Sequence, residues 1–122
     1  MLQVLFVDDE RLILEGLRDL LRPRRREWQM RFFASAEEAL RELACRPADV
    51  VVTDLRMPGM DGVTLLQEVS RIAGATVLIV LSGYAGDALA GGAEHIADAV
   101  LSKPCHPEAL KAAIDTARTT HA

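Results

Sequence analysis

The sequence predicts an α/β protein: a doubly wound, three-layer sandwich in which helices cover both faces of a five-stranded parallel sheet. Short, continuous apolar runs at residues 4–7, 30–34, 50–53, 77–81 and 99–101 are typical of strands that are buried on both faces. The segments between these runs carry apolar residues at helical spacing. Strands that alternate with helices in this way pair in parallel and are joined by right-handed crossovers.

Four of the five segments that follow the strands have clear helical patterns. Their apolar residues lie within residues 12–21, ahead of Pro23; within 39–43, after a capping box of Ser35 and Glu38; within 63–72, ahead of Gly74; and within 110–117, after Pro107. The remaining segment, residues 85–96, has three glycines and few large apolar side chains. Because glycine inside a helix costs about 1 kcal/mol relative to alanine, we expect a short or mobile helix there.

Length and composition favour one soluble domain that spans residues 1–122. Fourteen Lys and Arg residues against eighteen Asp and Glu residues give a net charge of −4. This balance argues against direct nucleic-acid binding and favours a basic partner or a cation. The apolar runs are far shorter than the roughly 18 to 20 residues that cross a bilayer, so we expect no membrane segment. Met1 leads directly into a strand without a secretory signal, so we expect a cytoplasmic location.

Two further features are interpreted as structural. Cys45 and Cys105 lie far apart and in no metal-binding spacing, so we expect two reduced, structural thiols. The arginine cluster at residues 22–26 is typical of a solvated helix end, where cations are favourable.

Polar residues follow four of the predicted strands. They are Asp8, Asp9 and Glu10 after the first, Asp54 after the third, Ser82 after the fourth, and Ser102, Lys103 and Pro104 after the fifth. Each alone is typical of a solvated loop or a turn, but together they gather at the carboxyl edge of the sheet, where ligands bind in this architecture. Clustered carboxylates repel one another unless a hard cation such as Mg²⁺ binds them, and Mg²⁺ also binds phosphate oxygens. Ser82 could donate to a phosphoryl oxygen and Lys103 could neutralise its charge, so this edge predicts a phosphoryl-handling site.

Four motifs carry a resemblance to a known family. They are FVDDE at 6–10, VVVTDLRMPGMDG at 50–62, LSGY at 81–84 and LSKP at 101–104. In this order and at this spacing, the chain resembles the receiver domain of two-component response regulators over essentially its whole length. The resemblance implies a flavodoxin-like (βα)5 fold with strand order 2-1-3-4-5.

The resemblance also implies a role for each residue of the predicted site. Asp54 would accept the phosphoryl group, and Ser82 and Lys103 would contact it. Asp9, Asp54 and the backbone carbonyl of Arg56 would bind Mg²⁺ directly, and Asp8 would bind it through water. The Lys103–Pro104 peptide bond would be cis, an isomer that proline makes accessible.

By the same resemblance, the chain is a signalling domain and not an enzyme, apart from its own phosphorylation and dephosphorylation. The donor would be a sensor histidine kinase or a phosphotransfer protein. The phosphorylated domain would act on an output domain in cis or on a partner in trans. The stretches 26–35, 81–84 and 102–110 look most like receivers fused to HD-type output domains. A homodimer through the face of the fourth helix, fifth strand and fifth helix is a further possibility that the family suggests.

Three further positions bear on how the domain switches and on how water reaches the acyl phosphate. Val100 stands where the family has an aromatic switch residue, so we expect switching to use reordering of residues 85–96 instead. Arg56 and Tyr84 occupy positions that in the family tune the access of hydrolytic water, and both are large here. We expect them to shield the acyl phosphate.

Three other interpretations of the same architecture remain open at this point. A flavodoxin-like electron carrier needs a phosphate loop after the first strand, where Asp8 and Asp9 would repel phosphate. An aspartyl phosphatase places a second acid two residues after its nucleophile, where this chain has Arg56. A receiver fold kept only as a binding scaffold is disfavoured because every phosphorylation residue is present.

Overall fold

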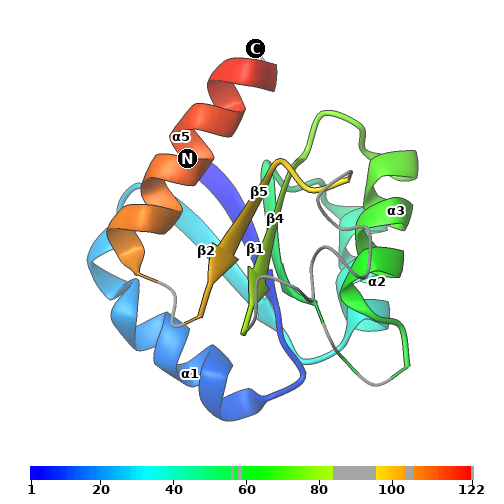
Figure 1. Ribbon diagram of the computed structural model, residues 1–122, viewed down its shortest axis with the longest axis horizontal. Coiled ribbons are helices and arrows are strands. Elements are labelled where there is room, and N and C mark those ends of the chain that lie inside the picture. Colours follow the sequence, from blue (N-terminus) through cyan, green and yellow to red (C-terminus); the bar gives the residue numbers. More distant parts are fainter. Residues whose placement is uncertain (56, 58, 84–95, 104–105, 122) are drawn as a thin grey trace.

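The apolar runs of the sequence form the central layer of a three-layer sandwich in the computed structural model, which describes residues 1–55, 57, 59–83, 96–103 and 106–121 (Figure 1). The strands are β1 (Leu2–Val7), β2 (Trp28–Phe33), β3 (Val50–Asp54), β4 (Val77–Ser82) and β5 (Ala99–Ser102). They pair in parallel in the order β2-β1-β3-β4-β5. The predicted strands and their order are therefore confirmed.

Helices connect the strands where the sequence predicts them. In the described part of the chain they are α1 (Arg11–Leu20), the short 3-10 helix η1 (Arg22–Arg24), α2 (Ala36–Cys45), α3 (Gly62–Ile72) and α5 (Pro107–His121). The Ser35 hydroxyl oxygen accepts a hydrogen bond from the Glu38 N–H at 3.1 Å and so caps α2, as the capping box predicts. The Asp61 carboxylate caps α3 in the same way, accepting from the Thr64 N–H at 2.8 Å.

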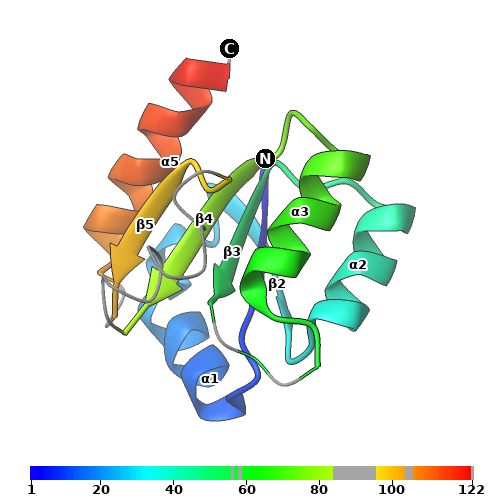
Figure 2. The ribbon, with the colours of Figure 1, turned by 45° about the vertical axis from the view of Figure 1, so that its right-hand side comes forward.

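Helices α2 and α3 lie on one face of the sheet and α1 and α5 on the other (Figure 2), and a hydrophobic core fills the space on each side. In β1, Leu5 and Val7 pack against α2 and α3, while Val4 and Phe6 pack against α1 and α5. All four side chains are buried, because the strand is covered on both faces. This double coverage explains why its sequence is continuously apolar and does not alternate with polar residues.

Three other expectations concern residues 85–96, the two cysteines and membrane-spanning segments. Residues 85–95, most of the segment expected to form a short or mobile helix, lie outside the described residues, as do Pro104 and Cys105. Cys45 is a free thiol, as predicted, and it is exposed at the end of α2. Among the described residues, no helix has the length and apolarity to cross a membrane.

Candidate functional site

Strand register brings the predicted site residues to one edge of the sheet. Val7 of β1 pairs with Thr53 of β3, so Asp8 and Asp54 follow side by side. Farther along the same edge, Ser82 of β4 pairs with Ser102 of β5. The N–H of the next residue, Lys103, donates to the Ser82 carbonyl at 2.9 Å, which fixes the start of the chain after β5.

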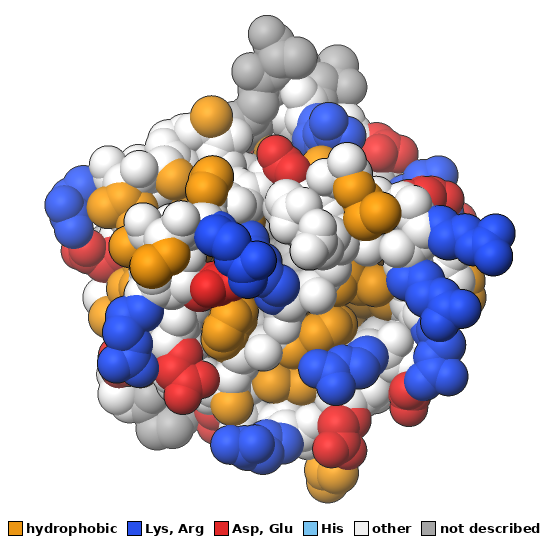
Figure 3. Space-filling view, turned by 180° about the vertical axis from the view of Figure 1, so that it is seen from behind, with side chains coloured by type: hydrophobic (Ala, Val, Ile, Leu, Met, Phe, Trp, Pro, Cys, Tyr) orange, Lys and Arg blue, Asp and Glu red, His pale blue; other side chains and the backbone are white. Residues whose placement is uncertain are grey.

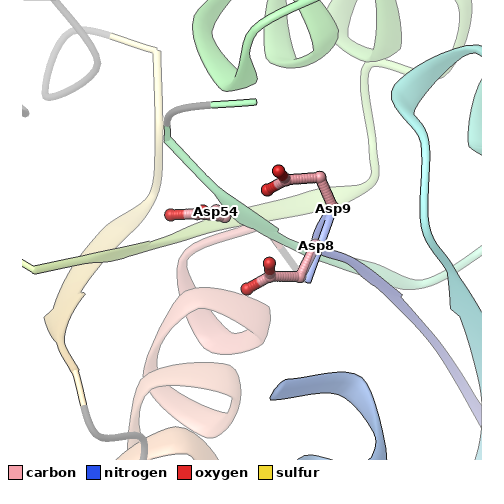
Figure 4. Close-up of side chains that lie close together, drawn as sticks. All are labelled: Asp8, Asp9 and Asp54. Carbon is pink, nitrogen blue, oxygen red and sulfur yellow. The ribbon is translucent and has the colours of Figure 1, made fainter. Parts of the chain in front are cut away.

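Three carboxylates meet at this edge. One carboxylate oxygen from each of Asp8, Asp9 and Asp54 lies within 4.8 Å of the other two. Figure 4 shows that Asp8 and Asp9 come from the end of β1 and Asp54 from β3. Asp8 and Asp54 are 2% and 9% exposed, so their charges are held largely out of water. With Lys103, these acids form the group that we call the carboxyl-edge cluster.

Lys103 supplies the positive charge of the carboxyl-edge cluster. Its Nζ lies 3.1 Å from Asp54 Oδ1 and 3.6 Å from Asp8 Oδ2. Burial by itself would lower the pKa of Lys103, but the hydrogen bond to Asp54 and the charges of Asp8 and Asp54 outweigh burial and raise that pKa. The side chain is therefore a protonated ammonium at neutral pH, and it touches two of the three acids.

Asp8 has one buried carboxylate oxygen, Oδ2, which lies 3.6 Å from the Lys103 ammonium, too far for a hydrogen bond. Its Oδ1 accepts the Glu10 N–H at 2.9 Å, whereas its buried Oδ2 has no hydrogen-bond donor among the described residues. Burial raises the pKa of Asp8; the Glu10 N–H and the charge of Lys103 offset part of this rise. A buried carboxylate oxygen without a donor, beside two further acids and only one ammonium, fits a hydrated divalent cation. The donor set is all oxygen, which suits Mg²⁺ and not Zn²⁺.

The loop after β3 depends on a residue that the sequence alone did not single out. A Cβ atom on Gly62 would lie 2.4 Å from the Asp54 carbonyl oxygen and 2.8 Å from the Leu55 Cα. The Gly62 N–H also donates to the Leu55 carbonyl at 2.8 Å and so closes the loop. The signal in the sequence is a poor helix former, glycine, placed directly after the capping residue Asp61.

The remaining predicted site residues are only partly described. Ser82 is 3% exposed at the end of β4. Val100 is 37% exposed; its neighbours Ala99 and Leu101 pack on the core beneath α1 and α5, so its side chain points to the opposite face of the sheet. Arg56, Tyr84 and Pro104 lie outside the described residues, and the roles suggested for them stay predictions.

Comparison with known proteins agrees with this geometry. The family model of the response regulator receiver domain matches residues 4–115. Among curated proteins, the chain is 31% identical over 126 residues to the transcriptional regulatory protein YesN of Bacillus subtilis, covering 94% of this chain and 32% of YesN. The chain thus spans about a third of the length of this relative.

Solved structures give the same answer for the fold. A response regulator receiver domain protein from Clostridium thermocellum superimposes with a TM-score of 0.85 at 29% identity, covering 98% of this chain and 96% of that one. The signal receiver domain of an HD domain-containing protein from Pseudomonas fluorescens Pf-5 superimposes with a TM-score of 0.82 at 30% identity, with the same coverage. The family match over nearly the whole chain and the acids gathered at the carboxyl edge lead to one conclusion: the chain belongs to the response regulator receiver domain family of two-component signalling.

Proposed function

We propose that this receiver domain accepts a phosphoryl group on Asp54 from a sensor histidine kinase or a phosphotransfer protein, in a reaction that depends on Mg²⁺. The observation that carries the proposal is the contact of 3.1 Å between the Lys103 ammonium and Asp54 Oδ1, made beside two further carboxylates. An ammonium held against one acid of such a group is placed to neutralise a phosphoryl group that forms on that acid.

In the transfer step, an Asp54 carboxylate oxygen attacks the phosphorus atom of phosphohistidine. A P–O bond forms while the P–N bond breaks, and the imidazole nitrogen leaves with the electron pair of that bond. The Lys103 ammonium faces the charge that gathers on the phosphoryl oxygens, and the Ser82 hydroxyl donates to one of them. The signal ends by hydrolysis. Water attacks the same phosphorus, the P–O bond to Asp54 breaks, and inorganic phosphate and the free carboxylate result.

Asp8, Asp9, Asp54 and the backbone carbonyl of Arg56 would hold Mg²⁺, with Asp8 acting through a bound water. When bound, the metal supplies positive charge opposite the transferring phosphoryl oxygens. The unsatisfied Oδ2 of Asp8 supports its part in the proposal, because a carboxylate oxygen without a protein donor can accept from a metal-bound water.

Phosphorylation would then change the surrounding loops and reach an output. The new group carries about two negative charges, which can draw the Ser82 hydroxyl inward. Because Val100 is small, the change would pass through residues 85–96, and Arg56 with Tyr84 would shield the acyl phosphate. The output is a domain in cis or a partner in trans; the similar YesN is a transcriptional regulatory protein, and the similar Pseudomonas domain belongs to an HD domain-containing protein.

The decisive experiment is an intact mass measurement after incubation with acetyl phosphate and Mg²⁺. We expect one added phosphoryl group on the wild-type chain and none on the Asp54→Asn variant, which keeps the size of the side chain but lacks the nucleophilic carboxylate. Omitting Mg²⁺ should also prevent the addition. A phosphoryl group that persists in Asp54→Asn would show that another residue accepts it and would overturn the assignment.

The same samples separate the other interpretations of the fold. A flavin spectrum in the purified protein would support an electron carrier, and repeated turnover of a generic phosphomonoester would support a phosphatase. Neither fits a chain that belongs to the receiver family, and we expect neither result.

A further inference from the structure

β2 is an edge strand of the sheet, and backbone groups on its outer side have no partner among the described residues. The Glu27 carbonyl accepts from the Leu2 N–H, and the Phe33 carbonyl accepts from the Asp8 N–H. The backbone N–H and C=O groups of the odd-numbered residues in this segment therefore point toward β1. Backbone groups alternate sides along a strand, so the N–H and C=O groups of residues 28, 30 and 32 point away from the sheet. Such an edge can pair with a further extended strand.

A hollow of about 770 Å³ runs along this edge. We call it the basic edge groove and define it by Arg18, Arg25, Trp28, Arg31, Phe32 and Arg46, which are among its lining residues. β2 lies at the back of the view in Figure 1, so Figure 3 faces this side of the molecule; hydrophobic side chains form a hollow there, and Lys and Arg side chains stand around it.

Positive charge is concentrated around the basic edge groove. Four arginines and one acid, Glu42, are the charged side chains that line it among the described residues, a net side-chain charge of +3 in a chain whose net charge is −4. Arg31 and Arg46 each lie 2.6 Å from the same oxygen of Glu42, so one carboxylate serves two guanidinium groups. One positive charge of this trio is therefore not neutralised.

Within the part of the chain that the structure describes, the two arginines on the other side of the groove have no acid partner. Arg18 lies over the Phe32 ring at 4.8 Å from its centroid, and neither Arg18 nor Arg25 forms an ion pair with another described residue. Both are exposed, so their guanidinium groups are accessible beside the strand edge. The groove thus combines unpaired backbone groups, an apolar floor and an excess of cations on both sides of the strand.

We propose that the basic edge groove binds an extended acidic segment of a partner protein, which adds to β2 as a sixth strand. The backbone of the segment would pair with residues 28, 30 and 32, and its carboxylates would meet Arg18 and Arg25 on one side and Arg46 on the other. A second copy of this chain is a poor occupant, because pairing two β2 edges would bring two sets of arginines together. None of these residues belongs to the carboxyl-edge cluster, so the proposal does not depend on the phosphoryl chemistry.

The probe for the test is an eight-residue peptide that alternates Glu with Val, blocked at both ends. Trp28 is the single tryptophan of the chain and lines the groove, so its fluorescence reports binding. We expect saturable binding, weakened by added salt, with shifts of the amide NMR signals of residues 28, 30 and 32. A peptide with Lys in place of Glu, and a Glu peptide whose backbone nitrogens are methylated, should not bind.

A matched pair of double variants tests the part played by the groove. Arg18→Gln with Arg25→Gln should weaken binding about tenfold, because two exposed ion pairs with the carboxylates of the peptide are lost. Arg71→Gln with Arg118→Gln changes the net charge equally on α3 and α5 and should leave binding unchanged. Equal weakening by both double variants, binding of the Lys peptide, or no binding at millimolar peptide would overturn the proposal. A concentration-dependent dimer of the wild-type chain that protects residues 28, 30 and 32 would also overturn it, in favour of a second copy.

Discussion

Gly62 holds no functional group, yet its missing side chain sets where the backbone of Asp54 can lie. Replacing it with alanine would place a methyl group 2.4 Å from the Asp54 carbonyl oxygen, so the loop after β3 has to shift. We expect Gly62→Ala to lower the free energy of unfolding by about 1–3 kcal/mol, the usual range for an overpacked position. Urea unfolding measures this change. Phosphorylation of the folded variant by acetyl phosphate should also slow, because Asp54 would be displaced from Lys103.

Gly16 provides the matched control. It lies inside α1, and a Cβ atom there would meet nothing within 4 Å. Gly16→Ala should therefore raise the free energy of unfolding by about 0.5–1 kcal/mol through helix propensity, and it should leave phosphorylation unchanged. If Gly62→Ala behaved like Gly16→Ala in both measurements, the close approach to Asp54 would have no effect on the site.

At the scale of elements, α2 is tied to β2 by one carboxylate. Glu42 of α2 accepts from Arg31 of β2 and from Arg46, both at 2.6 Å. The hydrogen bond from Arg31, followed by that from Arg46, lowers the pKa of Glu42 below its ordinary value of 4.5. A carboxyl group with a lowered pKa in the folded state stabilises that state above the unfolded pKa, and this stabilisation is lost as pH falls through the folded pKa.

Glu42→Gln should accordingly lower the free energy of unfolding at pH 7. The difference from wild type should shrink as pH falls below about 4.5, because the wild-type carboxylate also becomes neutral there. Urea titrations at several pH values measure both effects. Glu68→Gln is the control: it removes an ion pair of equal length, 2.6 Å, on α3, but between more exposed partners. If Glu42→Gln lowered the free energy of unfolding by the same amount at every pH, the shape of the side chain, and not its charge, would hold α2 to β2.

At the scale of the whole molecule, the carboxyl-edge cluster costs folding stability. Because burial raises the pKa of Asp8, its charged form is less favourable in the folded than in the unfolded state, so the molecule should gain stability as pH falls through the folded pKa. Asp8→Asn removes this charge and keeps an oxygen to accept the Glu10 N–H. We expect it to raise the melting temperature in the absence of metal by about 4 °C, corresponding to roughly 1 kcal/mol in a domain of this size.

Added Mg²⁺ should change the difference in melting temperature between the wild-type chain and Asp8→Asn. Binding to the folded state alone stabilises it in proportion to the logarithm of the metal concentration, so the melting temperature of the wild-type chain should rise with added Mg²⁺. Asp8→Asn should respond much less. Ca²⁺-free NaCl at matched ionic strength controls for screening. An equal response of the two proteins to Mg²⁺ would show that Asp8 takes no part in the metal site.

The sequence by itself determined the strands, four of the helices and the group of polar residues at the strand ends. These features are local, since hydrophobic period and capping residues such as Ser35 act within one element, and parallel strands place their carboxyl ends at one edge. Only the tertiary structure decided the contact between Gly62 and Asp54, the exposure of Cys45, and the groove that arginines from α1, β2 and the end of α2 form along β2. These depend on how elements far apart in the chain pack together, and packing at that distance leaves no periodic pattern in the residues that make it.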